Sequence, residues 1–228
     1  MPDPRLAQAD ALLRARQPLA AKAILDGVLA GTGPGRGDRR IALLLRSRAF
    51  EDQRQLPPAI ADLRAALALE PRDPKAYNTL GILLADSGDA DGAVGAFRQA
   101  TALDPKYIRG WNNLANALRT QGRAAEALAA AQRAVALQPD YAQAWGTLGV
   151  VQRDLGQETE AEASLRRALA LKPDYVPALT ALAAIARADA RLDDAVALYT
   201  RIGELSPLDG LALLLDRQFD EGWRHYEA

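Results

Sequence analysis

Apolar and small residues recur along this chain with a period of 34 residues, most regularly over residues 74 to 175. Within each period, the apolar positions are spaced three and four residues apart over two successive stretches, which is the spacing of two amphipathic helices. A glycine separates the two stretches in each period: Gly88, Gly122 and Gly156. A proline ends each second stretch: Pro105, Pro139 and Pro173. Because glycine permits a tight turn and proline cannot continue a helix, each period predicts one helix hairpin.

The same frame continues on both sides of its most regular part. It predicts five hairpins, with the boundaries 40–73, 74–107, 108–141, 142–175 and 176–209. The first is the least regular, because Arg46 and Ser47 stand where a leucine and a glycine are expected. The turn glycine is also replaced twice, by Arg54 in the first hairpin and by Ala190 in the last. The helical spacing survives these changes, so we expect hairpins at all five places.

Two flanking segments differ from the five hairpins. Residues 1–39 contain two short helical patterns and then the glycine-rich stretch 31–37, which predicts a degenerate hairpin followed by a loop. Residues 210–228 have the pattern of a half-repeat. Their apolar side chains form a stripe at helical spacing: Leu211, Leu213, Leu214, Leu215, Phe219, Trp223 and Tyr226. Since a solenoid needs a polar cap at its end, this stripe predicts a junction to a further domain, and it also offers a surface for self-association. The alternative is a natural C-terminus whose aromatic side chains pack back on Leu198 and Tyr199 of the last hairpin.

The residues that recur make the chain similar to the tetratricopeptide repeat family. When Pro74 is counted as position 1, position 4 is aromatic, position 8 is small, positions 20 and 27 are alanine, and position 32 is proline. The residues at positions 4, 8 and 20 are Tyr77, Trp111 and Trp145, then Gly81, Ala115 and Gly149, then Ala93, Ala127 and Ala161. The resemblance implies an all-α fold, a right-handed superhelical solenoid of helix hairpins. It also implies that the first helix of each hairpin, helix A, lines a concave inner wall.

Charge and composition exclude several classes of function. The chain carries 28 Lys and Arg against 29 Asp and Glu, and this balance argues against nucleic-acid binding, which needs a clustered basic excess. The absence of cysteine excludes disulfides and thiolate chemistry, and it agrees with a reducing compartment, so we expect a cytoplasmic location. No leader pattern and no run of about 18 apolar residues occurs, so we expect no membrane contact.

Catalytic chemistry has little support in the sequence. The single histidine, His225, lies near the end of the chain, and no Ser-His-Asp set can be built around it. We find no phosphate loop, dinucleotide fingerprint or metal-ligand spacing. We therefore predict a binding protein that is not an enzyme and that needs no cofactor or metal.

Candidate binding residues come from the family resemblance. In this family, positions 2, 5, 9, 12 and 13 of helix A face inward, and a ladder of amides can follow position 6. The resemblance assigns these partner-binding residues: Lys75, Asn78, Asp86, Arg109, Asn112, Asn113, Asn116, Arg119, Gln143, Arg153, Asp154 and Arg187. Guanidinium forks and amides suit carboxylates and peptide backbone. We expect a peptide or helix of a partner protein in the concave groove.

Structural alternatives stay open for three of these features. The arginines at position 12 can be ordinary solvated charges, because only four of the 28 basic residues are lysine. The asparagines resemble part of the amide ladder of O-linked N-acetylglucosamine transferases, although Thr147 and Ala181 interrupt it. Tyrosines recur at position 34 and can either form a stacking platform or pack between helices: Tyr107, Tyr141 and Tyr175.

Two functions fit these observations. The leading one is a non-catalytic protein-interaction scaffold that serves as the acceptor-recognition region of a larger bacterial protein O-glycosyltransferase, acting for example on a surface or flagellar protein. It is favoured because residues 217–227 resemble the segment that joins such arrays to their catalytic domain. The alternative is a stand-alone adaptor or assembly protein with no linked enzyme.

Overall fold

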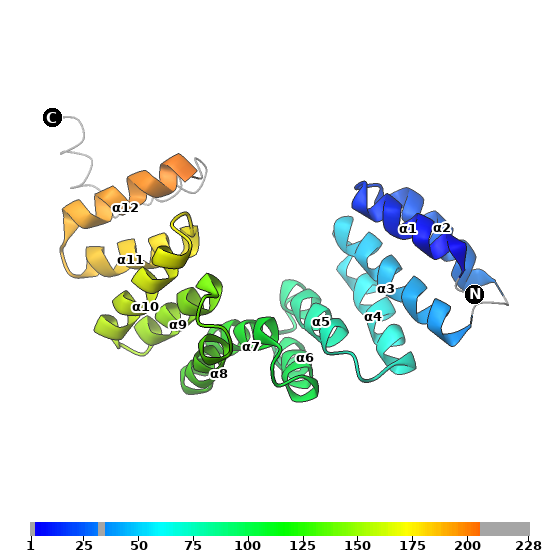
Figure 1. Ribbon diagram of the computed structural model, residues 1–228, viewed down its shortest axis with the longest axis horizontal. Coiled ribbons are helices and arrows are strands. Elements are labelled where there is room, and N and C mark those ends of the chain that lie inside the picture. The colour runs from blue at the N-terminus through cyan, green and yellow to red at the C-terminus, as the bar shows by residue number, and fades with distance from the viewer. Residues whose placement is uncertain (1–2, 32–34, 206–228) are drawn as a thin grey trace. The chain divides into compact units, whose positions relative to one another are not determined.

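The computed structural model describes residues 3–31 and 35–205, and all regular secondary structure within these ranges is helical (Figure 1). The predicted all-α solenoid of helix hairpins is confirmed. Its helices are α1 (Pro4–Arg14), α2 (Pro18–Ala30), α3 (Arg36–Asp52), α4 (Leu56–Leu69), α5 (Pro74–Asp86), α6 (Ala90–Leu103), α7 (Ile108–Thr120), α8 (Ala124–Leu137), α9 (Ala142–Asp154), α10 (Glu158–Leu171), α11 (Val176–Ala188) and α12 (Leu192–Leu205). The apolar stripe predicted over 210–228 lies outside the described residues.

The chain forms two compact units, residues 1–117 and 118–228. Unit 1 contains α1 to α6 and most of α7, and unit 2 contains the end of α7 and α8 to α12. Within each unit, the helices pack mainly against their neighbours in the sequence, which is the arrangement expected of a repeat array.

Side-chain caps mark the starts of α1, α5 and α6. Asp73 precedes α5, and its carboxylate accepts hydrogen bonds from the backbone amides of Lys75 and Ala76, while Pro74 occupies the first helical position. α3 begins at Arg36, four residues before the predicted boundary at 40. The Arg36 guanidinium donates to the Leu69 carbonyl at 2.6 Å, so this first turn is tied to the end of α4.

The turn between the two helices of each hairpin passes through a left-handed residue. These residues are Arg16, Arg54, Gly88, Gly122, Gly156 and Ala190, with φ between 56° and 86°. From Arg54 to Ala190 they follow one another at the 34-residue period of the sequence. Loss of the glycine at three of them therefore leaves the turn geometry unchanged, although a side chain in this conformation costs about 1–2 kcal/mol.

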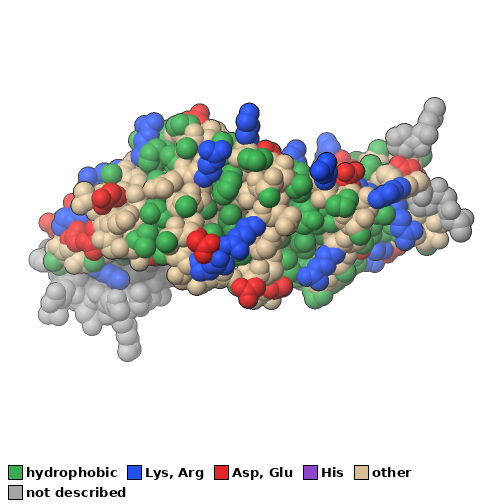
Figure 2. Space-filling model, turned by 90° about the horizontal axis from the view of Figure 1, so that it is seen from below, with side chains coloured by type: hydrophobic (Ala, Val, Ile, Leu, Met, Phe, Trp, Pro, Cys, Tyr) green, Lys and Arg blue, Asp and Glu red, His purple; other side chains and the backbone are tan. Residues whose placement is uncertain are grey.

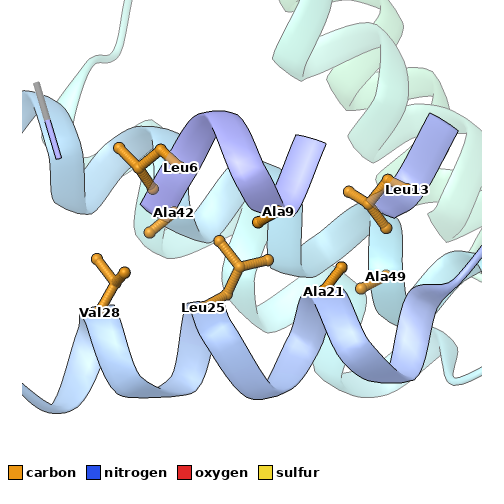
Figure 3. Close-up of a cluster of buried hydrophobic side chains, with 8 residues drawn as sticks. All are labelled: Leu6, Ala9, Leu13, Ala21, Leu25, Val28, Ala42 and Ala49. Atoms are coloured by element: carbon orange, nitrogen blue, oxygen red, sulfur yellow. The ribbon is translucent and has the colours of Figure 1, made fainter. Parts of the chain in front are cut away.

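The N-terminal hairpin shares its core with the following helix. α1, α2 and α3 each contribute small and branched apolar side chains to one cluster (Figure 3). Its buried members are Leu6, Ala9, Leu13, Ala21, Leu25, Val28, Ala42 and Ala49. The alanines let the helices approach closely, and the leucines fill the remaining space. The α1–α2 hairpin is thus one more layer of unit 1.

Charged residues replace part of the apolar packing in the least regular hairpin. Arg46 donates to both carboxylate oxygens of Asp62, at 2.7 and 2.8 Å, and to Asp26 at 2.8 Å. The neighbouring Ser47 hydroxyl is buried and donates to the Ala59 carbonyl at 2.8 Å. The hydrogen bond to Asp62 raises the pKa of Arg46, and that to Asp26 adds to it, although burial opposes both. Both departures from the repeat pattern therefore have hydrogen-bond partners.

Asp26 joins this group from α2. Burial raises the pKa of its carboxyl, but the hydrogen bonds from Lys22 and Arg46 outweigh that effect, so the pKa lies below its ordinary value. The Lys22 ammonium is 2.7 Å from Asp26 and also lies 5.4 Å from the centre of the Phe50 ring. We call Arg46, Asp62, Asp26 and Lys22 the Arg46 network.

Glycine at position 8 permits the predicted close helix contacts. A Cβ atom on Gly81 would lie 2.6 to 2.9 Å from three atoms of the Phe97 ring. A Cβ atom on Gly149 would lie 2.6 Å from Leu165 Cγ and 3.0 Å from the Ala161 carbonyl oxygen. A side chain at either place would overpack the hairpin.

The helices of the described part of the chain are too short or too polar to cross a lipid bilayer.

Candidate functional site

Three helix-A segments of unit 2 carry an arginine at the same repeat position. Arg119, Arg153 and Arg187 lie in the last turns of α7, α9 and α11. The basic groups are favourable there, because the carbonyl end of a helix is negatively polarised. All three side chains remain partly accessible. We call these three residues the arginine row.

Two members of the arginine row share one carboxylate. Arg119 Nη1 lies 3.2 Å from Asp154 Oδ2, and Arg153 Nη2 lies 3.2 Å from Asp154 Oδ1. The three side chains are each about a third exposed, at 31%, 34% and 30% for Arg119, Arg153 and Asp154. Because one negative charge faces two positive charges, this group keeps a net positive charge. Arg187 adds another, since it forms no ion pair with a described residue.

Arg119 has an unused hydrogen-bond donor. Its Nε atom is buried and has no hydrogen-bond partner among the described residues. Buried polar atoms in native proteins nearly always have a partner, so this donor is an exception within the described part of the chain. A carboxylate or a peptide carbonyl has the required chemistry.

The asparagines form a separate group in unit 1. Asn78 on α5 is buried, and its Oδ1 accepts a hydrogen bond from Asn113 Nδ2 on α7 at 2.9 Å. Asn112 is also buried, and its Oδ1 has no hydrogen-bond partner among the described residues. Asn116 Nδ2 donates to the Asn112 carbonyl at 3.2 Å. The amides thus hold neighbouring helices together in part, and only Asn113 and Asn116 are half-exposed.

The remaining predicted site residues are dispersed. Lys75 and Arg109 are exposed, Gln143 is half-buried, and Asp86 is exposed at the end of α5. The structure brings together Asn78 with Asn113, and Arg119 with Arg153 and Asp154. That these residues bind a partner remains a prediction.

The recurring aromatic residues contact the chain itself. Trp111 Nε1 donates to the Pro105 carbonyl at 3.0 Å, and Trp145 Nε1 donates to the Pro139 carbonyl at 2.9 Å. Each tryptophan therefore fixes the turn that precedes its own helix. The sequence analysis did not predict this role. The signal was the constant spacing of each tryptophan from the proline before it.

The tyrosines at position 34 favour the packing alternative. A Cβ atom on Gly146 would lie 2.5 Å from the Tyr175 ring, and one on Gly110 would lie 2.8 Å from the Tyr107 ring. Burial raises the pKa of the Tyr175 hydroxyl, and the neighbouring Tyr141 raises it further. A ring seated on a glycine backbone has one face covered, which leaves less surface for stacking on a ligand.

A groove that the prediction did not include lies on unit 1. It consists of a cavity of about 480 Å³ between α3 and α5 and a cavity of about 430 Å³ between α1 and α3. Arg48 and Asp52 line both cavities, and Glu51 lines the larger one. These residues occupy inward positions 9, 12 and 13 of the first hairpin. The sequence therefore contains the signal for this groove, in the least regular of the five hairpins.

No metal site stands out in the described part of the chain, and no basic patch stands out on the face drawn in Figure 2. No group of three His, Cys, Asp or Glu side chains among residues 3–31 and 35–205 is placed to hold a metal ion. On the face drawn in Figure 2, lysine and arginine side chains are scattered between hydrophobic and acidic ones.

Comparison with known proteins agrees with this geometry. A family model for the tetratricopeptide repeat matches residues 44–108 and 112–176. Among solved structures, the chain is similar to TTC0263, a thermophilic TPR protein of Thermus thermophilus, with 28% identity, 76% of this chain and 95% of that chain covered, and a TM-score of 0.65. No curated protein sequence gives a significant match.

Two further solved structures share the fold at lower identity. YrrB, described as a TPR protein with an unusual peptide-binding site, is 20% identical over 78% of this chain and 90% of that chain, with a TM-score of 0.66. MamA of Desulfovibrio magneticus RS-1 is 22% identical over 77% of this chain and 97% of that chain, with a TM-score of 0.63.

Proposed function

Because this chain belongs to the tetratricopeptide repeat family, we propose that it is an interaction scaffold that binds an acidic segment of a partner protein on the arginine row of unit 2. The arrangement of Arg119, Arg153 and Asp154 carries the proposal: two guanidiniums share one carboxylate, and the buried Arg119 Nε has no acceptor among the described residues. An incoming carboxylate pairs with the accessible parts of the two guanidinium groups and balances the excess positive charge. The peptide-binding site described for YrrB supports a peptide as the ligand.

The test is a binding titration with a defined probe. A fluorescein-labelled peptide rich in glutamate and leucine is titrated with the native chain and with Arg119→Ala/Arg153→Ala, and the anisotropy is measured. Loss of a charged hydrogen-bond partner costs about 1.5–3 kcal/mol, so the double variant should bind roughly tenfold to a hundredfold more weakly. A glutamine version of the peptide should bind weakly to both proteins.

Matched controls separate the proposed site from general electrostatics. Arg133 and Arg167 are exposed on α8 and α10, and neither has a described ion-pair partner. Arg133→Ala/Arg167→Ala removes the same charge from unit 2 and should change the affinity less than twofold. Equal losses from the two double variants would refute a role for the arginine row.

A link to an enzyme is a separate and weaker proposal. The resemblance of residues 217–227 to a glycosyltransferase junction supports it, and the similarities reported above add no support. In that case, the scaffold selects the protein that a bacterial O-glycosyltransferase modifies. If the gene is longer than this chain, transfer of sugar to an acceptor should fall when residues 1–209 are deleted. Undiminished transfer contradicts the link and leaves the stand-alone adaptor.

Two smaller expectations accompany these proposals. The lack of cysteine supports a cytoplasmic location, which fractionation of cells that express the tagged chain can test. Self-association through the apolar stripe at 210–228 is open to sedimentation analysis, with truncation at residue 205 as the comparison.

A further inference from the structure

The carboxylate that pairs with the arginine row comes from the chain itself. Beside these arginines, position 13 of the same three repeats is Thr120, Asp154 and Ala188. Asp154 is the acid among them, and Arg119 reaches it across the stack from a position 35 residues earlier in the chain. Among the described residues, only Asp154 forms ion pairs with the arginine row.

Asp154 holds its two arginines loosely. Each guanidinium reaches it through one nitrogen at 3.2 Å, a distance longer than the about 2.7–2.9 Å of a strong charge-assisted hydrogen bond. By contrast, Asp62 accepts two hydrogen bonds from Arg46 at 2.7 and 2.8 Å, and its side chain is only 9% exposed. Because ion pairs that are partly exposed add little to stability, Asp154 can release its arginines at a small cost.

A carboxylate at this place is also unfavourable for α9 itself. Asp154 is the last residue of the helix, where the backbone carbonyl groups repel a negative charge. Arg153 is its immediate neighbour, and adjacent residues on a helix do not face each other, so their contact depends on the Arg153 side chain turning sideways. The two arginines therefore account for Asp154 better than the stability of α9 does.

We propose that Asp154 is an internal competitor for the acidic ligand of the arginine row, an inference that rests on the function proposed above. In the free chain, its carboxylate occupies Arg119 and Arg153, and a carboxylate of the ligand replaces it on binding. The native chain therefore binds acidic segments more weakly than the arginines alone would allow. A segment with a single carboxylate gains no more from the arginines than Asp154 does, so the competitor selects for segments with several carboxylates.

The test is the anisotropy titration with the labelled peptide rich in glutamate and leucine. Asp154→Asn keeps the shape of the side chain and removes its charge, and Asp154→Ala removes the contacts altogether. Both variants should bind the peptide about fivefold more tightly than the native chain, which corresponds to the loss of one surface ion pair. The gain should shrink as salt is raised toward 1 M, where the screening length falls to about 3 Å.

Asp140→Asn is the matched control, because it changes the net charge of unit 2 by the same amount. Asp140 is exposed and has no described ion-pair partner. It precedes α9, a helix of 13 residues, so it lies roughly 20 Å from Asp154 along the helix axis. This variant should leave the affinity unchanged. Circular dichroism of each variant checks the fold.

A double-mutant cycle connects the gain to the two arginines. In the background Arg119→Ala/Arg153→Ala, Asp154→Asn should no longer tighten binding. The inference is overturned if the Asp154 variants bind no more tightly than the native chain, if Asp140→Asn gives the same gain, or if the gain persists without the two arginines. The proposed function fails by a different result, equal binding by the native chain and by Arg119→Ala/Arg153→Ala, so the two failures are distinguishable.

Discussion

Arg54→Gly is expected to stabilise the chain, although it removes a charged side chain and inserts glycine. Arg54 has a φ of 58°, and a non-glycine residue in this left-handed conformation costs about 1–2 kcal/mol. Glycine removes that cost but adds about 0.4–1 kcal/mol of freedom to the unfolded chain. The Arg54 side chain is exposed and has no described partner, so no contact is lost. The net gain is about 0.5–1 kcal/mol.

Two companion variants isolate the backbone effect. Arg54→Ala removes the same side chain but keeps the left-handed cost, so its stability should stay close to that of the native chain. Gly122→Ala adds the cost at a turn with a φ of 71°, where a Cβ atom would meet nothing within 4 Å. The free energy of unfolding of Gly122→Ala should fall by about 1 kcal/mol, and this loss has no steric contribution.

Urea unfolding followed by circular dichroism measures these changes. With a slope of about 2–3 kcal/mol/M, a gain of 1 kcal/mol moves the midpoint by roughly 0.3–0.5 M. Repeat arrays can depart from two-state unfolding, so hydrogen exchange in α3 and α4 provides a local reading of the same change. A lower midpoint for Arg54→Gly than for Arg54→Ala would refute the reasoning, because it would mean that the turn imposes no backbone cost on a side chain.

Three further changes probe packing and charge. Ala127→Leu should destabilise the chain by about 1–3 kcal/mol, because Ala127 is fully buried, whereas Ala125→Leu on the exposed side of α8 should have little effect on the thermal midpoint. Asp62→Ala should cost about 1.5–3 kcal/mol, because it removes the two-oxygen partner of Arg46, and a cost below about 0.5 kcal/mol in urea unfolding would show that water replaces it. The pKa of Asp26 is lowered in the folded chain, so its contribution to the free energy of unfolding is full above the ordinary aspartate value of about 3.9 and is lost as pH falls through the lower folded value. Asp26→Asn should therefore weaken the loss of stability at acid pH. An unchanged acid dependence of the urea midpoint would contradict this.

Helix content and hairpin turns depend on residues close together in the sequence, and for that reason they could be predicted. The apolar spacing of three and four follows from the geometry of a single helix. The starts of α5, α7, α9 and α11 coincide with the first position of the repeat frame. At α5, Asp73 and Pro74 supply the start signal within one turn of where they stand. The apolar spacing on both sides of the turn was enough to predict a hairpin even where the turn glycine is missing.

The left-handed backbone conformation of the turns without glycine could not be predicted from the sequence. A sequence with arginine or alanine at the turn gives no reason to expect a positive φ, which such residues avoid when they are free to do so. At Arg54 and Ala190, the packing of the two helices on each side fixes the path of the connection. The tertiary contacts exceed the local cost, so the packed hairpin decides the backbone conformation.

The partners of the polar side chains also depended on the tertiary structure. The sequence placed Asn78 and Arg119 at inward positions, but Asn78 is buried against Asn113, and Arg119 shares Asp154 with Arg153. The partners Asn78 and Asn113, and likewise Arg119 and Asp154, are 35 residues apart in the chain, so they meet only when neighbouring hairpins stack. A periodic sequence determines which face of a helix a residue occupies, while the rotation between stacked hairpins decides what that residue touches.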